Sequence, residues 1–215
     1  IHETGHGLYE QGRMQNGRDL PVSEALTMAI HESQSLFWER MIAQGKPFCA
    51  RYLPLVAETF PHNFRDVNSE QFYEAVNVSG PSLIRVEADE VTYPMHVILR
   101  YELEKGLFDG SIQVEHLPEM WNAKMKEYLG VEPPTDTLGV LQDTHWSGGA
   151  FGYFPSYTLG AIYASQFYQA LIRAKPGIEK QIEMGNLAPV REWLGIQIHQ
   201  QGRLLSVPAL VKRVT

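Results

Sequence analysis

The first six residues place the tightest constraint on how this chain can fold. His2 and His6 are four residues apart, and Glu3 follows the first histidine. On an α-helix, residues at this spacing lie on one face, so both imidazole rings can reach a single metal ion. Because a catalytic zinc usually has three protein ligands, a second element must bring a further ligand to this helix.

The segment from His2 to His6 has the H-E-x-x-H pattern, which is typical of zinc peptidases. In that pattern the glutamate is the general base for a metal-bound water, so we assign this role to Glu3. The alternative for Glu3 is a solvated charge at a frayed helix start.

Glu32 is our candidate for the third ligand. Apolar residues recur at helical spacing over residues 23–38, and Met28, Ala29 and Leu36 lie on the same face as Glu32. A carboxylate on an inward face is costly unless its charge is compensated, and a metal would compensate it. The alternative is a solvated residue at the edge of the apolar stripe.

Composition excludes several other classes. A formal net charge of −7 argues against a nucleic-acid binder, which would present a basic face. The single cysteine, Cys49, excludes an internal disulfide and fits a cytoplasmic protein. No uninterrupted apolar run is long enough to span a bilayer.

Capping residues and periodicity predict a chain made mostly of helices. We expect the first helix to end at Gly12 in a left-handed cap, and Ser23 to cap the helix that carries Glu32. Pro54 predicts a kink or break in the helix of residues 47–60, and Ser69 is expected to cap a short helix. The remaining helices are expected at 87–107, 118–130, 156–174, 178–184, 189–200 and 208–215.

Two segments are expected to be non-helical. In residues 77–86, turn residues flank β-branched and aliphatic ones, which predicts short strands. Residues 138–152 form a long loop that contains several glycines, and loops of that length in compact domains tend to be functional or disordered.

Three further stretches, taken with the first motif, make the chain resemble a known family. His31–Gln34 reads H-E-S-Q, residues 84–89 match an I/V-R-x-x-A-D motif, and residues 139–146 match G-x-x-Q-D-x-H-W. These motifs, in this order, resemble the M32 family of zinc metallocarboxypeptidases, the carboxypeptidase Taq type. The family's D-x-R-x-T motif, which precedes the zinc helix, is absent. We therefore expect residues 1–215 to be the C-terminal catalytic part of a larger peptidase domain.

The resemblance implies a mainly α, gluzincin-like fold with a small β-sheet near a deep active-site cleft. It also implies a homodimer that uses Zn²⁺, with Co²⁺ as an alternative, and that removes single C-terminal residues from peptides with broad specificity. Its partners would be peptides with a free C-terminus, and neither nucleic acid nor membranes.

Residues of the matched motifs are the candidates for substrate contacts. Arg85 is expected to grip the substrate's C-terminal carboxylate, since arginine binds carboxylates in a bidentate manner. The rival role for Arg85 is an ion pair with Asp89. His96 and Arg100, four apart on the next helix, are expected to line the same cleft.

The polar loop supplies the other candidates. Gln142 and His145 are expected to contact the peptide, with His145 donating a hydrogen bond, although a loop histidine is often simply solvated. Tyr157, or else Tyr153, is expected to support the oxyanion of the transition state. Glu10, four residues after His6, is a candidate for holding a metal ligand in place, or else a surface charge.

Two other functions remain open. One is a related helical oligopeptidase or dipeptidase, which would be indifferent to the chain end of its substrate. The other is an inactive structural fragment with an empty metal site.

Overall fold

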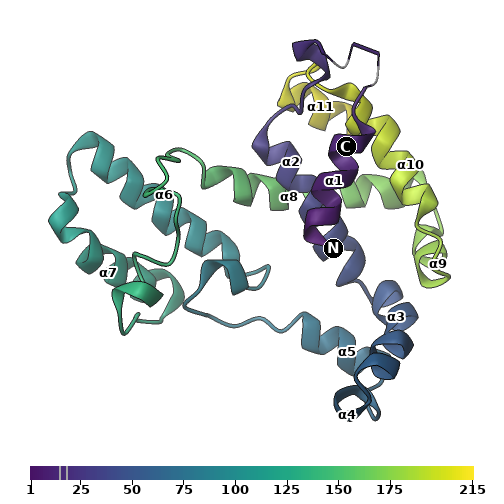
Figure 1. Ribbon diagram of the computed structural model, residues 1–215, viewed down its shortest axis with the longest axis horizontal. Helices are drawn as coiled ribbons and strands as arrows, with labels where there is room; N and C mark the ends of the chain where they lie inside the picture. The colour runs from purple at the N-terminus through teal and green to yellow at the C-terminus, as the bar shows by residue number, and fades with distance from the viewer. Residues whose placement is uncertain (15, 18) are drawn as a thin grey trace. The chain divides into compact units, whose positions relative to one another are not determined.

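The computed structural model describes residues 1–14, 16–17 and 19–215. They form two compact units, unit 1 being residues 1–77 with 159–215 and unit 2 being residues 78–158. Unit 1 contains α1 (His2–Gly12), η1 (Pro21–Ser23), α2 (Met28–Leu36), the π-helix η2 (Phe37–Ala43), α3 (Lys46–Thr59), α4 (Pro61–Phe64), α5 (Ser69–Val76), most of α8 (Pro155–Ala174), α9 (Ile178–Glu183), α10 (Ala188–Gln197), η6 (His199–Gln201) and α11 (Val207–Val214) (Figure 1). Unit 2 contains η3 (Arg85–Glu87), α6 (Tyr93–Asp109), η4 (Val114–His116), α7 (Leu117–Leu129), η5 (Asp136–Leu138) and the start of α8.

The described residues contain helices and no strand. The mainly α class is confirmed. The short strands predicted at residues 77–86 are wrong, and the small β-sheet that the resemblance implies is not seen among the described residues. A strand needs a neighbouring strand to form hydrogen bonds with its backbone groups, and here the side chain of Gln142 forms such bonds instead. The amide oxygen of Gln142 accepts a hydrogen bond from the Arg85 backbone, and its nitrogen donates to the Leu83 carbonyl.

The helix that carries Glu32 begins later than predicted. Thr27, and not Ser23, is its N-cap, and the Thr27 hydroxyl accepts a hydrogen bond from the Ile30 N–H at 3.3 Å. Ser23 lies in the short helix η1. After Leu36 the helix continues directly as the π-helix η2, a form that often occurs near functional sites.

Two other helix starts differ from the prediction. Asn68, and not Ser69, caps α5, in a capping box with Gln71. The helix predicted from residue 87 begins at Tyr93, because the Asp89 carboxylate accepts hydrogen bonds from the backbone and hydroxyl of Thr92. Burial raises the pKa of Asp89, but its hydrogen bonds outweigh this effect and hold the pKa well below its usual range.

Pro54 and Gly12 do not have all the effects on helix geometry that the sequence predicts. Pro54 does not break α3, which is continuous from Lys46 to Thr59. Gly12 does end α1, but it is the last helical residue and has no left-handed conformation. It is needed for a different reason, because a Cβ there would lie 2.4 Å from Nδ1 of His199.

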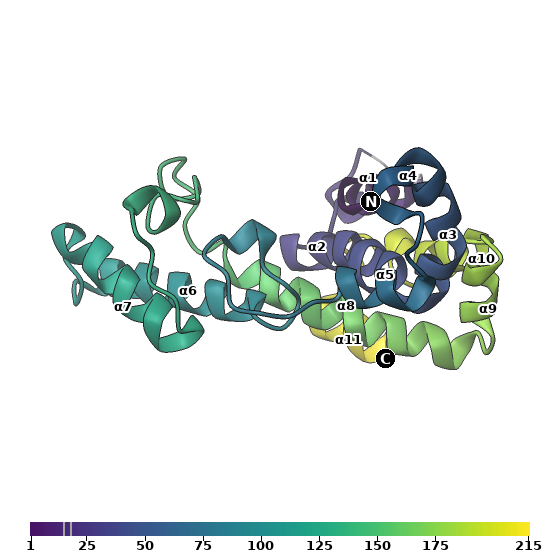
Figure 2. The same ribbon diagram turned by 90° about the horizontal axis from the view of Figure 1, so that it is seen from below.

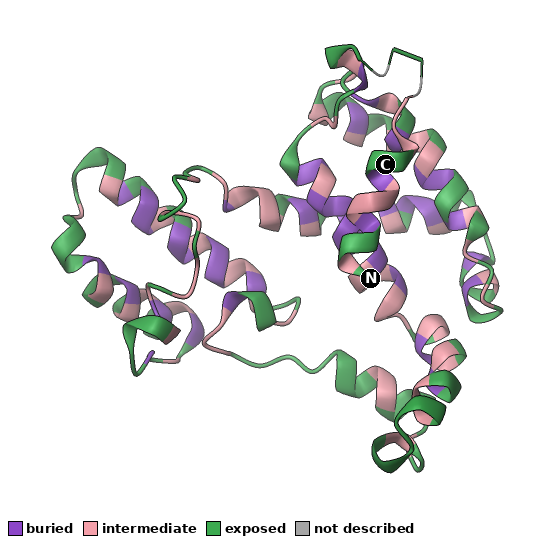
Figure 3. Ribbon diagram, viewed as in Figure 1, coloured by how far each residue is buried: buried purple, intermediate pink, exposed green. Residues whose placement is uncertain are grey.

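The hydrophobic core of unit 1 holds its long helices together. Phe37 of η2, Phe167 and Leu171 of α8, and Leu194 of α10 are each fully buried in one cluster. In Figure 3 the buried positions run along α2 and α8, whereas α4 and α5 contain no buried residue. At the far end of α8, Arg173 donates to the carbonyl of Thr215 beside α11 (Figure 2).

Unit 2 is built on α6 and α7, which pack through Leu99, Leu103, Trp121 and Met125. Both helices end at a glycine in the left-handed conformation, and Gly130 lies at the predicted end of α7. Among all described residues, no helix has the length and apolar character needed to cross a membrane.

Candidate metal centre

Helices α1 and α2 approach each other closely because α1 has a glycine, Gly5, at the point of contact. A Cβ at Gly5 would lie 2.6 Å from both the Gln34 carbonyl oxygen and the Ser35 Cα. Any larger residue would force the helices apart. The sequence therefore places His2 and His6 against the helix that carries Glu32.

His2, His6 and Glu32 come together in the way that the sequence predicts for metal ligands. Nε2 of His2 lies 3.7 Å from one Glu32 oxygen, and Nε2 of His6 lies 3.3 Å from the other. One ligand atom from each residue lies within 4.8 Å of the other two. Two imidazole nitrogens and a carboxylate are a donor set that zinc accepts in catalytic sites, with a position left for water.

The burial of Glu32 supports this assignment. Its residue is 6% exposed, so its charge must be compensated inside the protein. The two carboxylate oxygens face the two imidazoles, which carry no charge when they are ligands. A divalent cation between the three groups would supply the missing positive charge.

The second nitrogen of each imidazole is also engaged. Nδ1 of His2 lies 2.6 Å from Oε2 of Glu39, which is carried by the π-helix. This hydrogen bond is the main cause of the raised pKa of His2. Burial favours the neutral form of Glu39, but the His2 bond and the charge of Arg40 outweigh it and lower the pKa of Glu39.

Nδ1 of His6 has a histidine partner instead. It lies 2.6 Å from Nδ1 of His31, and Nε2 of His31 lies 3.0 Å from Oε1 of Glu10. Glu10 was our candidate for holding a metal ligand, and it reaches His6 only through His31. Sequence reasoning missed His31 and Glu39, although Glu39 is seven residues after Glu32 and thus near the same helix face.

Glu3, the predicted general base, is exposed on the first turn of α1. It is the residue after His2, so its backbone is fixed by the same helix. Its exposure leaves the carboxylate accessible to water and substrate.

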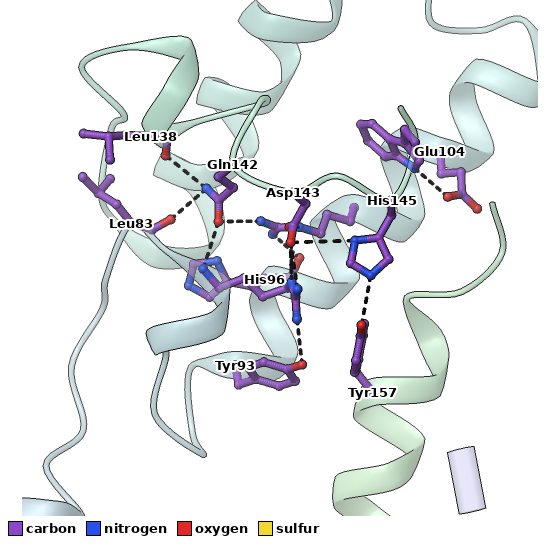
Figure 4. A network of polar contacts seen from close by, with 12 residues as sticks. Leu83, Tyr93, His96, Glu104, Leu138, Gln142, Asp143, His145 and Tyr157 are labelled. Carbon is purple, nitrogen blue, oxygen red and sulfur yellow. Dashed lines mark hydrogen bonds and ion pairs between the residues drawn. The ribbon is translucent and has the colours of Figure 1, made fainter. Parts of the chain in front are cut away.

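Unit 2 contains a second cluster of polar residues, centred on Asp143 (Figure 4). The Asp143 carboxylate accepts hydrogen bonds from Nε and Nη2 of Arg85 and from Nε of Arg100. Burial raises the pKa of Asp143, but the two guanidinium groups outweigh it, so the pKa is lowered. Arg100 is fully buried, which lowers its pKa to about 10, still far above neutrality. Two cations thus share one anion.

Arg85 does not have the environment expected of a carboxylate clamp. Its residue is 5% exposed, and besides the Asp143 bonds its Nη1 donates to the hydroxyl of Tyr93. The rival ion pair with Asp89 is also not formed, since Asp143 is the partner. A direct grip on a substrate would require this arrangement to open.

His96 and Gln142 are also used inside unit 2. His96 is fully buried, and burial and the nearby Arg100 charge lower its pKa to about 4. His96 was predicted to line the same cleft as Arg85, and a contact between this buried ring and a substrate stays a prediction. The Gln142 side chain has four partners, because it also accepts from Arg100 and donates to the Leu138 carbonyl.

His145 and Tyr157, in contrast, form a partly exposed pair. Nε2 of His145 lies 2.9 Å from the Tyr157 hydroxyl, and Nδ1 lies 3.9 Å from Asp143. Burial is the main cause of a lowered pKa for His145. Tyr153 is the neighbouring ring, at 5.6 Å from His145 and 5.2 Å from Tyr157.

A helical fold with two histidines of an H-E-x-x-H helix and a glutamate from a second helix defines the class of helical metallopeptidases. Residues 1–215 match the profile of the family described as carboxypeptidase Taq (M32) metallopeptidase. The chain belongs to this family.

Individual relatives agree with the family match. Carboxypeptidase 1 of Bacillus subtilis (strain 168) is 44% identical over 215 residues, which is 100% of this chain and 43% of the relative. Thermostable carboxypeptidase 1 of Thermus thermophilus is also 44% identical, over 100% of this chain and 42% of the relative. The crystal structure of the M32 carboxypeptidase from Deinococcus radiodurans R1 matches with a TM-score of 0.94 at 38% identity, over 100% of this chain and 43% of that one.

The chain thus spans less than half the length of the relatives it matches. These comparisons do not bear out our prediction that it is the C-terminal part of the peptidase.

Proposed function

We propose that the protein is a metal-dependent carboxypeptidase that removes single residues from the free C-terminus of peptides, with broad specificity. The observation that carries the proposal is the convergence of His2, His6 and Glu32, with ligand atoms within 4.8 Å of one another. The family supports a divalent metal, and nitrogen-rich ligation favours Zn²⁺, with Co²⁺ as the alternative.

His2, His6 and Glu32 would hold the metal, which supplies an acidified water and polarises the scissile carbonyl. Glu3 takes the proton of the attacking water and later delivers it to the leaving amine. Its exposed position on the first turn of α1 is compatible with both transfers.

His145 and Tyr157 are our candidates for contacts with the substrate. Both are partly exposed and can donate hydrogen bonds, and we assign support of the oxyanion to Tyr157 with Tyr153 as the alternative. Arg85 and Arg100 both bind Asp143, so these three groups together carry a net charge of one positive unit. This positive potential attracts a substrate carboxylate. We therefore revise the part of Arg85 from a direct clamp to a source of positive potential.

The test compares peptides that differ only at their C-terminus. The protein should trim a peptide with a free carboxylate, leave its C-terminally amidated form intact, and lose activity when a chelator removes the metal. Glu3→Gln should keep the metal and lose nearly all turnover. Equal cleavage of the amidated peptide would favour the alternative of an oligopeptidase, and the absence of bound metal in the full-length protein would favour an inactive structural role.

Two further properties belong to the proposal. The cytoplasmic location is supported by the single, buried Cys49 and is tested by cell fractionation. The homodimer rests on the family resemblance alone and is tested by light scattering of the full-length protein.

A further inference from the structure

The imidazole of His6 lies between the side chains of two consecutive residues of α2. Glu32 faces its Nε2 at 3.3 Å, and His31 faces its Nδ1 at 2.6 Å. The proposed function uses Glu32 as a ligand and gives no part to His31. One turn of helix therefore contacts both nitrogens of the same ring.

The hydrogen positions in this contact follow from its partners. Nε2 of His31 faces the carboxylate of Glu10, which can only accept, so this nitrogen carries a hydrogen. In a neutral His31 ring, Nδ1 is then a bare acceptor. His6 must donate from its own Nδ1, which leaves its Nε2 bare, and a bare nitrogen is what a metal requires.

We infer that His31 is a positioning residue of the metal centre. Its Nδ1 accepts a hydrogen bond from Nδ1 of His6, and its Nε2 donates a hydrogen bond to Glu10. The inference rests on the proposed function, since it concerns the nitrogen that His6 offers to a metal. Hydrogen bonds of this kind fix the tautomer and the ring orientation of a ligand histidine.

The structure holds His31 in place from two further sides. The ring of Tyr9, a residue only 1% exposed, meets it edge to face at 5.1 Å. Glu10 is itself held by Nη2 of Arg13 at 2.7 Å, one turn further along α1. His31 therefore has little freedom to turn away from His6.

His2 is supported differently, because its Nδ1 reaches the Glu39 carboxylate directly. The Nδ1 atoms of the two ligand histidines therefore have different partners, Glu39 and His31. Loss of His31 should impair His6 and leave the bond between His2 and Glu39 intact.

The test measures the affinity of the full-length protein for Zn²⁺, by competition with a chromogenic chelator. His31→Phe keeps a planar ring but removes both nitrogens, and should weaken zinc binding by about 10- to 100-fold. His31→Asn places an amide oxygen near the position of Nδ1, so it should recover much of that loss. The matched control is His62→Phe, at an exposed histidine of α4, which should bind zinc as the natural protein does.

Glu10 offers a second pair of variants that does not disturb the interior, since its side chain is 44% exposed. Glu10→Leu should weaken zinc binding several-fold, and Glu10→Gln, which keeps an acceptor oxygen, should weaken it less. Thermal unfolding of the metal-free variants separates this effect from a loss of fold.

The outcomes separate a failure of the inference about His31 from a failure of the proposed function. If the natural protein binds zinc tightly and His31→Phe binds it equally well, the part given to His31 is wrong and the proposed function stands. Equal weakening by His31→Asn and His31→Phe would also overturn it, because the acceptor would not matter. If the natural protein binds neither Zn²⁺ nor Co²⁺, the proposed function itself fails.

Discussion

Gly160 of α8 lies directly against the side chain of Glu32. A Cβ at Gly160 would be 2.8 Å from Cβ and 2.9 Å from Cγ of Glu32, closer than such atoms approach in proteins. Glycine at this position leaves the room that the Glu32 side chain occupies. The candidate metal centre thus depends on α8 as well as on the two helices that carry its ligands.

We predict that Gly160→Ala weakens zinc binding, because the new methyl group must displace Glu32 from the two imidazoles. Overpacking of this kind also lowers the free energy of unfolding by about 1 to 3 kcal/mol. Chelator competition measures the first effect and chemical denaturation the second. Gly195→Ala on α10 is the control, since a Cβ there meets no atom within 4 Å. Unchanged zinc affinity in Gly160→Ala would show that Glu32 is not held from this side.

Gln142 gives a prediction for unit 2. Its four hydrogen bonds join backbone groups of Leu83, Arg85 and Leu138 to the Arg100 side chain. Gln142→Leu has a similar volume but leaves these partners unpaired, so it should lower the free energy of unfolding by about 2 to 4 kcal/mol.

Chemical denaturation of Gln142→Leu is compared with that of Gln166→Leu, which replaces an exposed glutamine of α8. We expect the control to change stability by less than about 0.5 kcal/mol. Similar values for the two variants would mean that the hydrogen bonds of Gln142 contribute little to the stability of unit 2.

Local sequence signals predicted the ligand cluster but not its surroundings. Spacing of four residues placed His2 and His6 on one face, and the apolar stripe around Glu32 turned that carboxylate inward. The partners of the second nitrogens, His31 and Glu39, depend on how α1 and α2 pack, and periodicity alone does not give that packing.

Helices were predicted better than the connections between them. Pro118 and Gly130 marked the limits of α7 well, because both act through local backbone geometry. The strands expected at residues 77–86 were wrong, since their formation depends on a partner strand and the side chain of Gln142 takes the backbone groups instead. The ion pair between Arg85 and Asp143 was also not predicted, because Asp143 lies 58 residues away in sequence.

Tyr157 gives a prediction for catalysis. If its hydroxyl supports the oxyanion, Tyr157→Phe should lower kcat by about 100- to 1,000-fold and leave zinc affinity unchanged. Steady-state kinetics on a peptide with a free C-terminus measures the effect. Tyr153→Phe is the matched variant, and a larger loss there would transfer the role to Tyr153.

His199 gives a prediction for the pH dependence of stability. Its residue is 2% exposed, its Nε2 lies 3.0 Å from the Gln34 amide oxygen, and burial lowers its pKa to about 4 from the ordinary 6.5. Below pH 6.5, His199 is therefore protonated in the unfolded chain but stays neutral in the folded protein until the pH approaches 4. The free energy of unfolding should fall as the pH drops from about 6.5 to about 4, by on the order of 3 kcal/mol from this residue alone.

The variant His199→Gln isolates this contribution, because its amide nitrogen can still donate to Gln34 and does not titrate. Chemical denaturation from pH 8 to pH 4 should give parallel curves for the natural protein and the variant above pH 6.5. Below that pH the natural protein should lose stability more steeply, while His96, whose pKa is also lowered to about 4, affects both proteins equally. A constant difference over the whole range would mean that His199 has the same pKa in the folded and unfolded protein, and that its burial does not destabilise the charged form.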